Sequence, residues 1–222
     1  MKKSLVIGAS RGIGLELVKQ LKTKGQEVWA STRSASSLKA LEELHAITLQ
    51  LDVSSESSIE AFKQSLVGEH FDWVVYVAGV YGPRSDAKQE VNIQDFDEVM
   101  HTNVLGAMKL MAILAPKVTA QSGKMVFISS QMASMEQTDS SSGWIYKASK
   151  AALNMCVKAA SSSYPDICLL SVSPGWVKTD MGGEFAPLTA TQSVQGIFRT
   201  IDQATLADTG RFMGHQRESI PF

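Results

Sequence analysis

A tyrosine and a lysine four residues apart, Tyr146 and Lys150, are the side chains of this sequence best suited to proton chemistry. On a helix, residues at i and i+4 share one face, with Cβ atoms about 5 to 6 Å apart. Tyrosine has a pKa of about 10, and moving it about 3 units toward working pH takes roughly 4 kcal/mol, which a nearby cation helps supply. The pair therefore suits acid catalysis, although any amphipathic helix can carry the same pair for structural reasons.

A serine hydroxyl lies shortly before this pair in the sequence. Ser129 and Ser130 follow an apolar run that ends at Ile128 and is expected to be a strand. Open parallel sheets bind ligands at the carboxyl ends of their strands. We therefore expect this serine pair to lie beside Tyr146 and Lys150.

Three glycines mark the first turn of the chain, which reads Gly8-Ala9-Ser10-Arg11-Gly12-Ile13-Gly14 between an apolar run and a helical pattern. Such glycines let the backbone approach a pyrophosphate, let the helix pack closely on the strand, and place the helix amino terminus at the phosphates. Tight turns also need glycine without any ligand. The position in the first strand-to-helix turn of an alternating chain favours a dinucleotide site.

The end of the second expected strand carries Arg33, where an NAD site usually has an acidic residue about 20 positions beyond the glycine turn. A guanidinium matches a 2'-phosphate, and Arg11 can assist from the glycine turn. The alternative is that both arginines are solvated surface residues. The pattern predicts NADP(H) as the preferred cofactor, with NAD(H) possible. Asp52 and Val53 are placed to meet the adenine, but Asp52 could instead cap the following helix.

Strand and helix patterns alternate along the whole chain. Apolar runs predict strands at residues 5–7, 27–32, 46–51, 71–77, 124–129, 167–173 and 211–213. Helical spacing predicts helices at residues 13–24, 36–44, 55–67, 95–119, 144–162 and 190–203, with a serine cap at 54 or 55 and a capping box from 95 to 98. Continuous apolar runs indicate strands buried on both faces. This order predicts one α/β domain, residues 1–222: a doubly wound parallel sheet of about seven strands, right-handed crossovers, and helices on both faces.

Composition excludes several classes of protein. The 222 residues are 44% hydrophobic and 19% charged with a net charge of -1, which argues against disorder, nucleic-acid binding and attachment to an anionic membrane. The apolar stretches 73–80 and 104–116 are shorter than the ~18 residues of a membrane span. Cys156 and Cys168 lack CxxC spacing and neighbouring histidines, which predicts buried thiols and no metal site. The short apolar start predicts no signal peptide and a cytoplasmic protein.

Six motifs occur in one fixed order and together resemble the short-chain dehydrogenase/reductase family, a Rossmann-fold family, over essentially the whole chain. They are the glycine turn, Asp52-Val53, Asn103, Ile128-Ser129-Ser130, Tyr146 with Lys150, and Ser173-Pro174-Gly175. The segments KASKAALNM and PGWVKTDMGG and the closing Ile220-Pro221-Phe222 are most similar to the C-factor-like carbonyl reductases of that family.

The resemblance implies roles for four catalytic residues. Tyr146 would donate the proton to the carbonyl and Ser130 would orient the substrate. Lys150 would lower the tyrosine pKa and bind the nicotinamide ribose, and Asn103 would complete a proton relay through a backbone-bound water. The interval from Ser130 to Tyr146 is longer than in most members, so Ser134 is a second candidate for the catalytic hydroxyl.

The resemblance also implies a cofactor site. The residues expected to contact the cofactor are Gly8, Ser10, Arg11, Gly12, Ile13, Gly14, Arg33, Asp52, Val53, Ala78, Gly79, Tyr146, Lys150, Pro174, Gly175, Val177 and Thr179. Two positions depart from the family pattern. Val77 stands where an asparagine usually ties neighbouring strands, which implies a different local hydrogen-bond network, and Ile7 replaces a common threonine.

The implied reaction is hydride transfer between NADP(H) and a carbonyl or alcohol substrate. The substrate is expected to be a small apolar or aromatic aldehyde or ketone, because the segments expected to wall it are apolar: Val80, Tyr81, Gln131, Met132, Met135, Trp144, Trp176, Met181 and Phe185. Residues 178–188 are expected to form a lid that orders with cofactor. The competing class is a dinucleotide-binding sensor or signalling protein of the same fold without turnover.

The family resemblance also implies a homodimer or homotetramer that assembles through the helices at 95–119 and 144–162. Such an interface needs an apolar outer face on each helix. Met108, Met111, Met155 and Val157 are the candidate residues.

Overall fold

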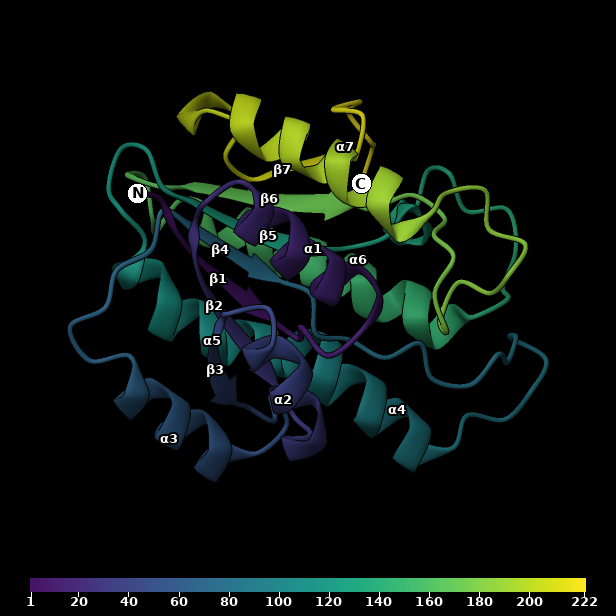
Figure 1. Cartoon of the computed structure of the whole chain (residues 1–222). Coiled ribbons are helices and arrows are strands. Elements are labelled where there is room, and N and C mark those ends of the chain that lie inside the picture. Colours follow the sequence, from purple (N-terminus) through teal and green to yellow (C-terminus); the bar gives the residue numbers. More distant parts are fainter.

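Seven parallel strands form one sheet in the order β3-β2-β1-β4-β5-β6-β7 in the computed structural model, which describes all 222 residues (Figure 1). The strands are β1 Lys3–Ile7, β2 Glu27–Thr32, β3 Ile47–Gln50, β4 Trp73–Tyr76, β5 Lys124–Ile128, β6 Cys168–Ser173 and β7 Arg211–Gly214. The α-helices are α1 Gly12–Thr23, α2 Ala35–Glu42, α3 Glu56–Ser65, α4 Ile93–Met100, α5 Gly106–Leu114, α6 Trp144–Ala160 and α7 Ala190–Gln203. The predicted doubly wound α/β sheet of seven strands is confirmed.

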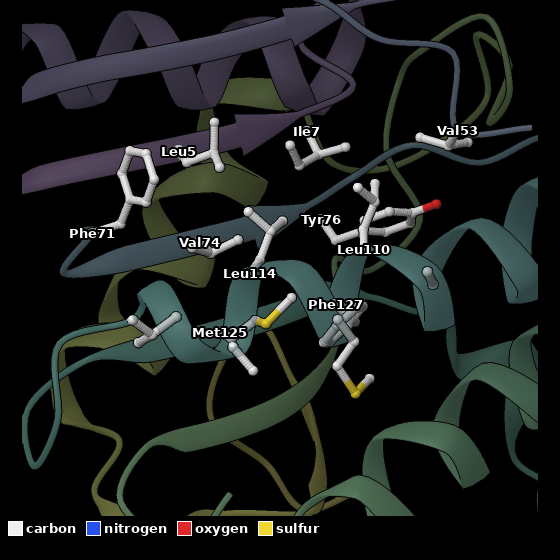
Figure 2. Close-up of a cluster of buried hydrophobic side chains, with 14 of the residues drawn as sticks. Leu5, Ile7, Val53, Phe71, Val74, Tyr76, Leu110, Leu114, Met125 and Phe127 are labelled. Carbon is white, nitrogen blue, oxygen red and sulfur yellow. The ribbon is translucent and has the colours of Figure 1, made fainter. Parts of the chain in front are cut away.

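The sheet is covered on both faces, and two hydrophobic clusters fill the space between the layers. One cluster joins the strands to α1, α2 and α7, and the other joins them to α3, α5 and α6. In the second cluster Leu110 and Leu114 of α5 face Val74 and Phe127 of the sheet (Figure 2). Full burial of such side chains stabilises a fold by about 1.5 to 3 kcal/mol each. The prediction of strands buried on both faces fails at the edge strand β3, where Ile47 and Gln50 are exposed and Thr48 and Leu49 are half-buried.

The last crossover departs from the predicted right-handed rule. Helix α7 packs beside α1 on the same face (Figure 1), although β1 to β2 and β6 to β7 move across the sheet in opposite directions. The β6–α7–β7 crossover therefore has the opposite hand to β1–α1–β2. The long connection between β6 and α7 allows this, since it carries the chain over the edge formed by the carboxyl ends of the strands before α7 begins.

The helical region between β4 and β5 differs in detail from the prediction. It begins at Ile93, because Asn92 rather than Asp95 caps it by accepting the backbone N–H groups of Gln94 and Asp95. A π-helix, His101–Leu105, interrupts it before α5. The continuous stretch Ile93–Lys117 is long and apolar enough to cross a membrane by length and composition, contrary to the prediction, but half of its most apolar window is buried in the protein, as in a core helix.

The candidate interface residues divide into two groups. Met111 and Val157 are buried in the hydrophobic core, so their proposed place in a subunit interface is wrong. Met108 is 49% exposed and Met155 is 64% exposed. These two methionines are the candidates that remain available to a second chain.

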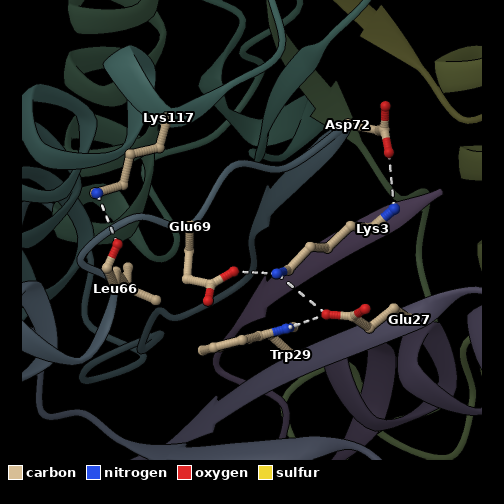
Figure 3. A network of polar contacts seen from close by, with 7 residues as sticks. All are labelled: Lys3, Glu27, Trp29, Leu66, Glu69, Asp72 and Lys117. Carbon is tan, nitrogen blue, oxygen red and sulfur yellow. Dashed lines mark hydrogen bonds and ion pairs between the residues drawn. The ribbon is translucent and has the colours of Figure 1, made fainter. Parts of the chain in front are cut away.

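A polar network closes the end of the sheet opposite the carboxyl ends of the strands. The ammonium of Lys3 lies between the carboxylates of Glu27 and Glu69, and Glu27 also accepts the indole N–H of Trp29 at 2.8 Å (Figure 3). The backbone N–H of Lys3 donates to Asp72 at 2.7 Å. These contacts join β1, β2 and the segment before β4, and they leave the opposite end of the sheet free for a ligand site.

Candidate active site

A cavity of about 490 Å³ lies at the carboxyl ends of the strands, where the strand order reverses between β1 and β4. Such a reversal is where open α/β sheets bind ligands. The predicted cofactor residues that line it are Gly8, Ser10, Arg11, Gly12, Ile13, Arg33, Asp52, Val53, Ala78, Gly79, Tyr146, Lys150, Pro174 and Thr179. The structure thus brings together predicted residues from six separate stretches of the chain.

The glycine turn supplies one wall of the cavity. Gly8 has a φ of +87°, and a Cβ there would lie 2.7 Å from the backbone nitrogen of Ala78. Gly14 does not line the cavity, and a Cβ there would lie 2.1 Å from the carbonyl oxygen of Gly8, so this glycine serves close packing of α1 on β1. Arg11, at the cap position, makes no side-chain cap and no acidic residue occupies the first turn of α1. The free N–H groups of this turn can bind an anion.

Two arginines border the same wall. Arg33 is exposed and enters no ion pair with any residue of the chain. Arg11 does not face a free site: its guanidinium pairs with Asp180 at 2.9 Å, with both side chains about three-quarters exposed. Of the two arginines, Arg33 is therefore the one without an ion-pair partner, although its charge acts on the nearby Asp52.

Asp52 faces the cavity and also stabilises the turn that leads into α3. It lines the cavity, and its carboxylate also accepts the N–H and the hydroxyl of Ser54, at 2.9 and 2.6 Å. The cap of α3 is Ser55, which accepts from Ser58. Burial alone would raise the pKa of Asp52, but the Ser54 hydrogen bonds and the charge of Arg33 outweigh burial and lower it.

Asn103 lies in the π-helix and anchors the segment after β4. Its amide accepts the N–H of Val80 and donates to the carbonyl of Val80, both at 2.8 Å, and donates to the hydroxyl of Ser149 at 2.9 Å. The hydroxyl of Tyr76 donates to the carbonyl of Thr102 at 3.0 Å. These bonds fix β4 and the segment after it to the π-helix. They differ from the network expected where an asparagine occupies the position of Val77.

Tyr146 and Lys150 lie on one face of α6 and both line the cavity. The Lys150 ammonium donates to the carbonyl of Ile128 at 2.8 Å and lies 5.7 Å from the centroid of the Tyr146 ring. Burial raises the pKa of Tyr146 to about 12, with the hydroxyl of Ser130 acting in the opposite direction. Burial lowers the pKa of Lys150 to about 8. The surroundings thus favour the uncharged form of each group, and the expected lowering of the Tyr146 pKa is not what this environment produces.

The serines after β5 separate into different roles. Ser130 accepts the N–H of Met132 at 3.2 Å and interacts with Tyr146, whereas Ser129 lines the cavity with a buried hydroxyl that has no partner within the protein. Ser134 is buried, and its hydroxyl accepts the N–H of Gln137. Neither Ser130 nor Ser134 lines the cavity, but Ser130 is the one of the two whose hydroxyl interacts with Tyr146.

The segment after β6 forms the outer wall. Pro174 and Thr179 line the cavity, but Gly175 and Val177 do not. Val177 is buried and pairs with Leu188, and a Cβ at Gly175 would lie 2.6 Å from Leu188. These two residues shape the connection to α7 and contribute no surface to the cavity.

The expected substrate walls are only partly assembled. Val80 and Met181 line the cavity, while Met135, Trp176 and Phe185 are exposed and lie outside its lining. Ser129 of the expected serine pair and Lys178 and Asp180 of the expected lid also line the cavity. Sequence reasoning missed six lining residues: Ile7, Thr32, Leu51, Val77, Thr102 and Ile128. Most of these stand at or next to the carboxyl end of a strand, and that position was the available signal.

The fold and the cavity define a nucleotide-binding α/β oxidoreductase with a tyrosine and lysine pair. The family model of short chain dehydrogenases matches residues 2–188, and the chain belongs to this enzyme family. C-signal from Myxococcus xanthus is 31% identical over 167 residues, which cover 74% of this chain and all of that protein. The 1-hydroxy-2-glutathionyl-2-methyl-3-butene dehydrogenase of Rhodococcus sp. (strain AD45) is 30% identical, with 96% of each chain covered.

Solved structures agree with this assignment. A carbonyl reductase from Pseudomonas aeruginosa PAO1 in complex with NADP is 31% identical, with a TM-score of 0.88 over the whole of both chains. The NADPH-bound carbonyl reductase from chicken fatty liver is 28% identical, with a TM-score of 0.91 over 100% of this chain and 99% of that one.

Proposed function

We propose that this enzyme is an NADP(H)-dependent carbonyl reductase in which Tyr146 is the proton donor. The observation that carries the proposal is that Tyr146 and Lys150 lie on the wall of the same cavity as the glycine turn and Arg33. Proton chemistry and dinucleotide recognition are thereby available in one site.

The residues present fit a phosphorylated dinucleotide. The free N–H groups at the start of α1 suit a pyrophosphate, and Gly8 and Gly12 leave space for its approach. Arg33 suits a 2'-phosphate because its fork carries no other charge partner. Pro174 and Thr179 line the same cavity as Tyr146 and would hold the nicotinamide end of the cofactor. The NADP and NADPH named with the two carbonyl reductases support this choice.

The protein residues then have distinct tasks. When bound, the nicotinamide supplies the hydride. Tyr146 holds the proton that the carbonyl oxygen receives, and a pKa of about 12 keeps that hydroxyl protonated at neutral pH. Ser130 orients the oxygen, and Lys150 holds the ribose and returns the proton to Tyr146. Asn103 can serve a relay only through its backbone carbonyl, since its amide is bound to Val80 and Ser149.

The substrate that we propose has an apolar or aromatic body. Val80 and Met181 give the cavity an apolar edge, and Trp176 and Phe185 are exposed on the segment that borders it. We also propose a cytoplasmic homodimer or homotetramer, for which the exposed Met108 and Met155 are the supporting observation.

Cofactor binding is the first test. NADPH and NADH are titrated by fluorescence against the wild type and Arg33→Ala. NADPH should bind at least about tenfold more tightly than NADH, a difference of about 1.4 kcal/mol, and Arg33→Ala should remove most of that difference. Equal affinities in the wild type would refute the role of Arg33.

Turnover is the second test. Tyr146→Phe should lower kcat with aromatic aldehydes by about 10²- to 10⁴-fold and retain NADPH binding. Tyr164→Phe, at a half-buried tyrosine packed against the core away from the cavity, is the matched control and should keep wild-type activity. Tight NADPH binding with no carbonyl reduced by the wild type would refute the reductase and favour the sensor function, for which similarity to C-signal is the supporting observation.

A further inference from the structure

A second tyrosine lies directly against the proposed proton donor. The rings of Tyr81 and Tyr146 are stacked, with centroids 4.6 Å apart and planes inclined by 21°. Gly143 makes room for this arrangement at the start of α6: it has a φ of +67°, and a Cβ there would lie 2.3 Å from the Tyr81 hydroxyl. The segment after β4 is therefore built to place an aromatic ring beside Tyr146.

Arg84 extends this stack outward. Its guanidinium carbon lies 5.1 Å from the centroid of the Tyr81 ring, and one of its N–H groups donates to the carbonyl of Met181 at 3.2 Å. Met181 itself lines the cavity. Arg84 thus bridges the segment after β4 and the segment after β6, one aromatic ring removed from Tyr146.

The charge of Arg84 is not neutralised by the protein. No carboxylate forms an ion pair with it: Asp180 is paired with Arg11, and Asp86 accepts the backbone N–H of Lys88. A guanidinium has five N–H donors, and the carbonyl of Met181 uses one. The remaining donors can form the bidentate contact that guanidinium makes with a carboxylate.

We propose that the substrate of this enzyme is an aromatic carbonyl compound that also carries a carboxylate, and that Arg84 binds that carboxylate. This inference rests on the proposed reductase function and names its substrate class. Val80 and Met181 give the apolar edge against which the aromatic body would lie, and Arg84 would set the orientation by holding the charged end. Arg33, to which we assign the 2'-phosphate, lines the cavity directly, whereas Arg84 reaches it only through its contact with Met181, so the two arginines would hold different anions.

Two substrates that share a formylphenyl body, one with a free carboxylate and one with that carboxylate esterified, test the proposal. The probes are 4-carboxybenzaldehyde and its neutral methyl ester, methyl 4-formylbenzoate, with NADPH as reductant and benzaldehyde as a reference. The wild type should show a kcat/KM about fivefold higher for the acid than for the ester. Arg84→Leu should bring this ratio to about one, Arg84→Lys should give an intermediate ratio because it keeps the charge without the fork, and 0.5 M salt should lower the wild-type ratio.

Lys88→Leu is the matched control, because Lys88 is an exposed cation of the same segment whose side chain makes no polar contact. It should leave the ratio unchanged. An acid-to-ester kcat/KM ratio of one or less in the wild type overturns the inference, and so does a preference for the acid that survives in Arg84→Leu. If benzaldehyde is still reduced in either case, the reductase proposal stands. Absence of reduction of all three aldehydes overturns both.

Discussion

Replacing the buried Lys150 with methionine should remove a cost to folding that is largest at neutral pH, although it also leaves the carbonyl of Ile128 without its donor and removes a residue of the proposed catalytic set. Lys150 is 4% exposed, and burial lowers its pKa from 10.5 to about 8. Between pH 8 and 10.5 the unfolded chain therefore binds more protons at this residue than the folded chain. The contribution of Lys150 to the free energy of unfolding therefore rises with pH through that window. Below pH 8 the folded state carries the full free-energy cost of the lowered pKa.

The size of the effect follows from the two pKa values. One pKa unit corresponds to about 1.4 kcal/mol, so lowering the pKa of Lys150 from 10.5 to about 8 costs folding roughly 3 kcal/mol at pH 7 and roughly 1 kcal/mol at pH 9.5. Methionine fills a similar volume and carries no such pH-dependent cost, and its loss of the hydrogen bond to Ile128 does not vary with pH. The free energy of unfolding of Lys150→Met relative to the wild type should therefore fall by about 2 kcal/mol between pH 7 and pH 9.5.

Urea unfolding of both proteins at pH 7, 8 and 9.5 measures this difference. The range stops at pH 9.5 because Tyr146, with its pKa raised to about 12, begins to change stability in the opposite direction above pH 10. Lys158→Met, at an exposed lysine on the same helix, should show a pH-independent difference from the wild type. A constant difference for Lys150→Met as well would refute the argument that burial sets its pKa.

Three further outcomes follow from other parts of the structure. Asn103→Leu should destabilise the protein by about 3 kcal/mol in urea unfolding, because the buried N–H and carbonyl of Val80 lose their partner. Asn154→Leu should be neutral or stabilising, because neither polar atom of the buried Asn154 amide has a hydrogen-bond partner to lose. Met108→Glu combined with Met155→Glu should give a monomer by light scattering, and an unchanged oligomer would exclude that face as the interface. Saturating NADPH should slow proteolysis near Gly183, and unchanged cleavage would count against an ordering lid.

The sequence predicted the strands well because their signal is local. Burial on two faces demands continuous apolar runs, and the predicted bounds of β2 and α7 agree with the structure in every residue. The residues that line the cavity were equally predictable from the sequence, since residues that directly follow parallel strands must meet at one edge of the sheet.

What the sequence could not predict depends on contacts between distant segments. The π-helix around Asn103 follows from bonds to Val80 and Ser149, which no periodicity displays. The pairing of Arg11 with Asp180 joins residues 169 positions apart. The hand of the last crossover depends on which face α7 covers, and amphipathic spacing is the same for either face.

The contacts of the segment after β6 explain why its order should depend on ligands. Arg11 and Asp180 are 77% and 75% exposed, and such an ion pair contributes about 0 to 1 kcal/mol and weakens with salt. The hydrogen bond from Trp176 to the carbonyl of Gly182 lies within the segment and ties it to nothing else. The contact from Arg84 to Met181 is a single exposed hydrogen bond. Arg11 and Arg84 therefore hold this segment only weakly, and Arg84 is the one of the two to which we assign an anionic group of a ligand. Binding of a substrate carboxylate at Arg84 would fix its side chain against Met181 and with it the segment, which couples closure of the site to occupation by substrate.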